Sequence, residues 1–278
     1  MHFVISDYKE VMHVTLLCFM VPYLSVAWGA LIKATWGWTI PISVLRGQIL
    51  RDIPISLRSH SATFTITNNC PYVIWPALLT SSGPIASTTG FELPSQSTST
   101  IVAPAPWSGR MWARSYCSGG NDSFNCQTGN CGSKQIPCNG LGGEPPASLI
   151  EFTLAGGGNL DFYDVSLVDG FNLPVTVTAR DGCPSTSCPV DLNASCPDEL
   201  ALKDPSGGKV GCKSACMVYG TPEYCCNGDH ATPSTCGPSK YSEFFKNKCP
   251  QAYSYAYDDK TSTFTCPTGG DYRITFCP

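Results

Sequence analysis

Apolar and polar residues alternate in short runs along most of the chain after its first 61 residues. In residues 150–154, isoleucine, phenylalanine and leucine alternate with one glutamate and one threonine, so an expected strand has one apolar and one polar face. Residues 162–168 form a second run of this kind, which ends at the turn signal Asp169-Gly170. We therefore expect two strands that bury one face in a core and leave acidic side chains outside it.

Four carboxylates belong to residues 150–170: Glu151, Asp161, Asp164 and Asp169. Because side chains alternate along a strand, Asp164 and Asp169 would point to opposite faces of an unbroken strand. They can share a site only if the chain bends near Asp169-Gly170. The pattern thus makes that bend a condition for an acidic site.

Further strand-like runs are separated by turns rich in glycine, proline and serine, at the spacing typical of a sandwich or barrel. These runs cover residues 62–70, 72–75, 97–102, 111–114 and 272–277. Short helices are expected at 196–200 and 239–249, the second with Ser239 as its N-cap. The length of 278 residues fits one large all-β domain or two smaller ones.

The composition indicates an oxidised, loop-rich protein. The chain has 17 cysteines, 26 glycines and 23 prolines, and only 14% of its residues are charged. This composition is typical of disulfide-stapled proteins of the secretory route. A zinc site is disfavoured because His230 is the one histidine after residue 60. We expect no metal and no other cofactor.

Residues 1–61 differ from the rest of the chain. Val14–Ile32 is an uncharged run of 19 residues, and the basic residues that follow it are scattered. We interpret the region as a secretory leader that ends near Ser61/Ala62; the alternative is a membrane anchor formed by residues 14–32, which are just long enough to span a bilayer. Removing Cys18 with the leader leaves sixteen cysteines, an even number.

The body that follows the leader is acidic. Its 12 Lys and Arg against 18 Asp and Glu give a formal charge of −6. An acidic surface argues against nucleic acid and anionic membranes as partners. The body also contains two N-glycosylation sequons, which begin at Asn121 and Asn193 and are meaningful only in a secreted chain.

A series of short motifs runs through residues 62–278. They are ATFTITNNC at 62–70, WAR at 112–114, CQTGNC at 126–131, PP at 145–146, EF at 151–152, DVS at 164–166, GFN at 170–172, YCC at 224–226, CGP at 236–238, YSEFF at 241–245 and FCP at 276–278. With these motifs the body resembles the thaumatin-like, or osmotin-like, family of pathogenesis-related group five plant defence proteins.

The resemblance implies an all-β fold, a flattened β-sandwich with short helices and two disulfide-rich loop regions. The sandwich core would comprise residues 62–116, 147–187 and 250–278, and the loop regions residues 117–146 and 188–249. It also implies eight disulfides: Cys70–Cys277, Cys117–Cys126, Cys131–Cys138, Cys183–Cys266, Cys188–Cys249, Cys196–Cys212, Cys216–Cys225 and Cys226–Cys236.

In similar proteins a cleft between the sandwich and the larger loop region is lined by one arginine, one glutamate and three aspartates. The residues that match them here are Arg114, Glu151, Asp164, Asp169 and Asp258. Arg114 is alternatively a structural ion-pair partner, and Asp258 has a neighbouring twin in Asp259. The chain departs from the family at Asn130, where an aspartate is usual, and at Asp122, where a glycine is usual. Both departures change local charge outside the acidic residues.

Clustered carboxylates raise one another's pKa values, and a nearby arginine keeps some of them ionised. A glycosidase uses this combination, because one carboxylic acid protonates the leaving oxygen while a second carboxylate acts as base or nucleophile. Glu151 is the candidate acid and Asp169 its partner. Tyr163, Phe171 or Tyr257 are candidates for stacking on sugar rings.

The resemblance implies a secreted, antifungal protein whose cleft binds β-1,3-glucan or another fungal cell-wall polysaccharide, with weak endo-β-1,3-glucanase activity. Binding without hydrolysis is an equal reading of the acidic residues. The alternative class is a non-enzymatic hydrolase inhibitor, or a membrane-perturbing defence protein, that acts through its surface. We expect a monomer outside the cell rather than in the vacuole, because the chain ends at Cys277-Pro278 without a trailing peptide.

Overall fold

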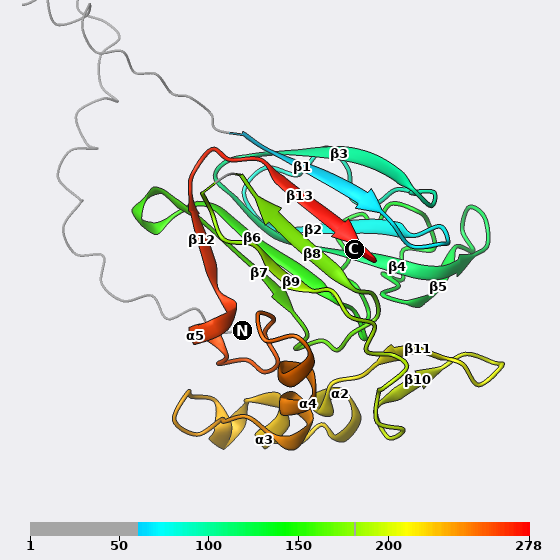
Figure 1. Cartoon of the computed structure of the whole chain (residues 1–278). Helices are drawn as coiled ribbons and strands as arrows, with labels where there is room; N and C mark the ends of the chain where they lie inside the picture. Colours follow the sequence, from blue (N-terminus) through cyan, green and yellow to red (C-terminus); the bar gives the residue numbers. More distant parts are fainter. Residues whose placement is uncertain (1–60, 181) are drawn as a thin grey trace, which may run out of the picture. The chain divides into compact units, whose positions relative to one another are not determined.

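The computed structural model describes residues 61–180 and 182–278 (Figure 1). The expected leader therefore lies outside the described residues except for Ser61, as do the apolar run Val14–Ile32 and Cys18. Within the described residues, no helix is both long and apolar enough to cross a membrane.

One sheet contains five strands in the order β3-β1-β13-β8-β9. Its members are β1 (Ser61–Asn68), β3 (Ser97–Pro104), β8 (Val175–Ala179), β9 (Thr186–Cys188) and β13 (Tyr272–Phe276). The first and last strands of the described chain, β1 and β13, pair in parallel at its centre, and the other pairs are antiparallel.

The second sheet has the order β12-β7-β6-β4-β2, and β5 also pairs with β4. All of its neighbouring strands are antiparallel. The strands are β2 (Trp75–Ser82), β4 (Trp107–Ser118), β5 (Asn125–Thr128), β6 (Leu149–Gly156), β7 (Leu160–Ser166) and β12 (Phe264–Pro267).

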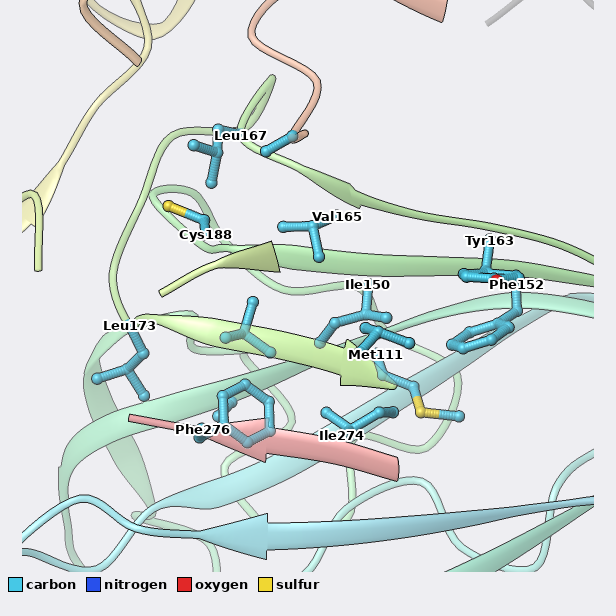
Figure 2. Packing of buried hydrophobic residues seen from close by; sticks show 14 of the residues in the cluster. Met111, Ile150, Phe152, Tyr163, Val165, Leu167, Leu173, Cys188, Ile274 and Phe276 are labelled. Carbon is cyan, nitrogen blue, oxygen red and sulfur yellow. The ribbon is translucent and has the colours of Figure 1, made fainter. Parts of the chain in front are cut away.

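The core lies between the two sheets. The Phe64 ring of β1 is 4.7 Å from the Phe152 ring of β6, and Tyr272 of β13 is 4.8 Å from the same phenylalanine, measured between ring centroids. Figure 2 shows Ile150 and Phe152 in this packing, with Ile274 from the opposite sheet. The apolar face expected for residues 150–154 is confirmed, since all three of its apolar side chains are buried.

The remaining elements are short and belong mostly to the larger disulfide-rich region. They are β10 (Ala201–Lys203), β11 (Lys209–Cys212), α2 (Ala215–Tyr219), α3 (Pro222–Cys225), α4 (Lys240–Lys248), α5 (Asp259–Ser262) and the 3-10 turns Gly157–Asn159 and Gly228–His230. Ser239 caps α4 as expected, since its hydroxyl accepts a hydrogen bond from the backbone N–H of Ser242.

Three expectations about local structure are wrong. Residues 196–200 form a turn rather than a helix, because Cys196 is bonded to Cys212 and the backbone closes on itself from Leu200 N–H to the Pro197 carbonyl. The strand expected at 72–75 instead starts at Trp75 and continues to Ser82. Its partner β4 is also longer than residues 111–114.

The chain forms all eight disulfides that the family resemblance implies. Cys70–Cys277 joins the end of β1 to the end of β13 and spans 207 residues, whereas Cys117–Cys126 spans nine. In the chain-entropy model, longer loops restrict the unfolded chain more. The bond between the first and last strands of the described residues is therefore the one that most limits unfolding of the sandwich.

Replacing Cys70 and Cys277 together by alanine should lower the free energy of unfolding by about 5 kcal/mol, and replacing Cys117 and Cys126 by about 2.6 kcal/mol, if loop entropy dominates. Urea denaturation of the two double variants would measure both losses. Equal losses would contradict the dependence on loop length.

Candidate functional site

Three charged side chains form a row across the outer face of the second sheet. Arg110 of β4 is directly opposite Glu151 of β6, and Glu151 is directly opposite Asp164 of β7. Directly opposed residues on antiparallel strands have Cβ atoms about 4.5–5.5 Å apart. All three point away from the core, because their strand neighbours Ile150 and Val165 are fully buried in it.

Asp169 joins this row from a turn. Strand β7 ends at Ser166, and the Gly170 backbone N–H donates to the Leu167 carbonyl at 2.9 Å. Gly170 has φ +84°, and a Cβ there would lie 2.5 Å from the Cys212 carbonyl oxygen, so glycine is required at this position. The bend set as a condition for an acidic site is therefore present.

The turn brings Asp169 to Arg110, with 4.0 Å between Oδ2 and Nη1. Both side chains are about one-third exposed, at 36% and 31%. We call Glu151, Asp164 and Asp169 the acidic cluster. Arg110 is the cation that faces it.

Burial is the main cause that raises the pKa of each carboxyl group in the acidic cluster. The pKa of Asp164 lies well above its ordinary value, since Glu151 and Asp259 add to the effect of burial. Asp164 Oδ1 is also buried without a hydrogen-bond partner among the described residues. For Glu151 and Asp169, Arg110 opposes the rise. The cluster therefore holds protons at a pH where exposed carboxylates have lost them.

Arg114, expected in the cleft, lies elsewhere. It is fully buried, and its guanidinium donates to the Trp75 carbonyl at 3.1 Å and to the Ile136 carbonyl at 2.7 Å. Burial lowers its pKa to about 10. In the described part of the chain it forms no ion pair, so the alternative of a structural ion-pair partner is also wrong.

The loop after β5 explains this difference. Arg110 and Arg114 are four residues apart on β4 and face the same side of the sheet. Residues 129–147 cover the far half of that side, where the Trp112 indole N–H donates to the Gly129 carbonyl at 2.7 Å. Arg114 is enclosed under this loop, whereas Arg110 lies at its edge beside Gly142 and stays about one-third exposed.

Asp258 is engaged away from the acidic cluster. Its Oδ2 lies 2.9 Å from the Lys246 ammonium and accepts hydrogen bonds from the backbone and hydroxyl of Ser254. Its twin Asp259 is the one that raises the pKa of Asp164. The Tyr253 hydroxyl donates to Asp259 Oδ1 at 2.8 Å. Tyr253, which sequence reasoning missed, and Asp259, which it named only as the twin of Asp258, are thus neighbours of the cluster.

The three residues expected to stack on sugar rings do not line an exposed site together. Tyr163 and Phe171 are fully buried and belong to the core. Tyr257 is half-buried, and its hydroxyl donates to the Ala231 carbonyl. Aromatic residues on strands are mainly core residues, and the first two follow that rule.

A hollow open to solvent, with an empty volume of about 360 Å³ that includes space at its mouth, lies beside the turn that precedes Asp169, and none of the three acidic-cluster residues lines it. Its lining includes Val168, which precedes Asp169, and Ser254, which donates to Asp258. Glu223, Tyr224 and Tyr255 line its side in the larger disulfide-rich region. Residues 61–180 and 182–278 contain no group of three or more Asp, Glu, His or Cys arranged to hold a metal ion.

Residues 68–278 match the profile of the Thaumatin family. The chain belongs to the thaumatin family. Thaumatin-like protein 1 of Pyrus pyrifolia is 56% identical over 224 residues, which cover 79% of this chain and 92% of that relative. A relative from Prunus avium, named glucan endo-1,3-beta-glucosidase, is 55% identical over 225 residues with the same coverage.

A solved structure of a laminaripentaose-producing beta-1,3-glucanase shares the fold of this thaumatin-family protein. Its TM-score is 0.51 at 13% identity, over 78% of this chain and 98% of that one. At this identity the likeness concerns the fold alone.

Arg114→Met should lower the free energy of unfolding by roughly 2–4 kcal/mol, because the carbonyl groups of Trp75 and Ile136 lose their buried donor. Arg110→Met is the matched control on the same face of β4 and should change it by less than about 0.5 kcal/mol. Urea denaturation measures both. A larger loss for Arg110→Met would reverse the roles given to the two arginines.

Asp164→Asn should stabilise the protein more at pH 7 than at pH 4. In the unfolded chain the Asp164 carboxyl group loses its proton near its ordinary pKa of 3.8, whereas in the folded protein it keeps the proton to higher pH. The contribution of Asp164 to wild-type stability therefore falls as pH rises above 3.8. Denaturation curves at several pH values would show the difference between variant and wild type. Glu92→Gln, at an exposed position, is the control and should show no such trend.

Proposed function

We propose that this thaumatin-family protein is a secreted plant defence protein whose acidic cluster binds and slowly hydrolyses β-1,3-glucan of fungal cell walls. The observation that carries the proposal is the row Arg110, Glu151 and Asp164 with Asp169 beside it, since it combines proton-holding carboxyl groups with one cation. The name of the Prunus avium relative supports the choice of glucan. Eight disulfides fit an oxidising, extracellular location.

Glu151 is the general acid in this proposal. Burial raises its pKa, and the neighbouring Asp169 adds to that rise, so the side chain can carry a proton at the mildly acidic pH of a plant cell wall. A protonated carboxyl group can donate to the oxygen of the glycosidic bond as that bond breaks. The pKa of Asp164, opposite Glu151, is raised still more clearly by burial, which disfavours a second negative charge beside the acid.

Asp169 is the second carboxylate, which acts as base or nucleophile. Arg110 opposes the rise of its pKa and therefore favours the ionised form that this role requires. Arg110 acts through Asp169 and Glu151, so we regard it as a positioning residue. Asp169 is also the more exposed partner and can be reached by a polysaccharide.

The test is binding and reducing-sugar release on a soluble β-1,3-glucan, with the oxidised full chain and its Glu151→Gln variant. Loss of the acid should lower the rate of release by about 10²–10⁴-fold, while glucan binding changes little, because glutamine keeps the shape of the side chain. Glu92→Gln removes an exposed carboxylate outside the cluster and is the matched control.

The outcomes separate the candidate functions. Release by wild type and by Glu92→Gln, but not by Glu151→Gln, places the acid at Glu151. Binding without release by wild type would leave a glucan-binding defence protein without hydrolysis. If the wild type shows neither binding nor release, the glucan is rejected as the ligand. A protein partner at the surface then becomes the leading candidate.

A further inference from the structure

The two N-glycosylation sequons have different surroundings in the folded protein. We propose that the secreted protein carries an N-linked glycan on Asn121 and none on Asn193. The proposal is independent of the glucan function. It requires only that the chain enters the secretory route, where sequons are modified.

Asn121 lies in the exposed turn between β4 and β5. Asn121, Asp122 and Ser123 are all exposed, and the turn is closed by the backbone N–H of Gly120, which donates to the Ser123 hydroxyl at 3.1 Å. The disulfide Cys117–Cys126 holds the base of the turn. No hydrogen bond of the Asn121 side chain occurs within residues 61–180 and 182–278, so its amide nitrogen is free to carry a sugar.

Asn193 is part of a structural network. Its Nδ2 donates to the Asn172 carbonyl at 2.9 Å, and its Oδ1 is buried without exposed surface. Asn172 is itself buried and donates from its side chain to the Ala113 carbonyl at 2.8 Å and to the Thr128 hydroxyl at 2.9 Å. Asn193 therefore links the larger disulfide-rich region to β4 and β5 of the second sheet.

The chemistry of the transfer shows why this setting excludes a glycan. C1 of the first sugar forms a bond to the asparagine Nδ2, and its bond to a lipid-linked pyrophosphate breaks; the pyrophosphate leaves and the amide loses one proton. The product is a secondary amide, which is planar and trans, so the sugar carbon lies on the same side of the C–N bond as Oδ1. At Asn193 that side is filled by protein, because Oδ1 has no exposed surface.

A chain glycosylated at Asn193 before folding could not close this network. The sugar would need the protein-filled space beside Oδ1, so the Asn193 side chain would have to move away and give up its hydrogen bond to the buried Asn172 carbonyl. Such a buried unpartnered carbonyl is destabilising. Native protein that leaves the secretory route should therefore lack this modification.

The proposed glycan lies far from the acidic cluster along β4. Asn121 lies three residues beyond Ser118, the last residue of β4, whereas Arg110 lies near Trp107, the first residue of β4. A glycan on Asn121 would therefore leave the approach to Arg110 and Asp169 open.

The test is site mapping on the full chain, residues 1–278, produced in leaf cells and recovered from the secretory route. A glycan-releasing amidase in heavy-oxygen water converts each glycosylated asparagine to a mass-labelled aspartate. We expect the label at Asn121 alone. Ser123→Ala removes that sequon but keeps Asn121, and it should remove the whole glycan mass; Ser195→Ala, the matched change in the other sequon, should leave the glycan mass unchanged.

A second measurement tests the structural role of Asn193. Asn193→Asp also destroys the sequon, and in addition it replaces the donor to the Asn172 carbonyl by an oxygen. We expect unchanged glycan mass and a Tm lower by roughly 2–4 °C, whereas Ser195→Ala keeps the wild-type Tm. A label at Asn193, or a secreted chain without a glycan on Asn121, would overturn the proposal.

Discussion

The antiparallel pairing of β4, β6 and β7 is the constraint on which the site depends. One register brings Arg110, Glu151 and Asp164 into a row and simultaneously turns Ile150 and Val165 into the core. Because the side-chain period of a strand is two, a slip of one residue would bury the three charges and expose the apolar set. The free energy of burying the core therefore also holds the charged row in register.

Alternation along β6 and β7, and the turn at Asp169-Gly170, could be predicted from the sequence because they depend on local pattern. The disulfide pairing could not be derived in this way and came from the family resemblance. The choice between Arg110 and Arg114 is a different problem, since both lie on the same face of one strand. Only the path of residues 129–147, which close over Trp112, decides which arginine remains accessible.

The adjacent aspartates Asp258 and Asp259 show the same limit of prediction from local sequence pattern. Asp258 and Asp259 are adjacent and chemically identical, and no local pattern separates them. Lys246, which lies on α4, forms an ion pair with Asp258, whereas the Tyr253 hydroxyl donates a hydrogen bond to Asp259. Likewise, nothing in the two Asn-x-Ser sequences distinguishes an exposed turn from an asparagine held against Asn172. These assignments require the contacts between elements that are distant in sequence.

The acidic cluster is energetically unfavourable for the folded protein, because it buries carboxyl groups that are poorly paired. Three partly or largely buried carboxyl groups face a single arginine 4.0 Å from one of them, and Asp164 Oδ1 has no partner among the described residues. Well-paired charges would make the sheet surface more stable, because an unpartnered buried polar atom is unfavourable. Natural proteins accept such conflicts mainly at functional sites, provided that the surrounding structure is firmly held. Here the aromatic core beneath Glu151 and the Cys70–Cys277 bond, which joins the ends of β1 and β13 in the opposite sheet, supply that support. The raised pKa values can therefore persist without unfolding the strands that carry them.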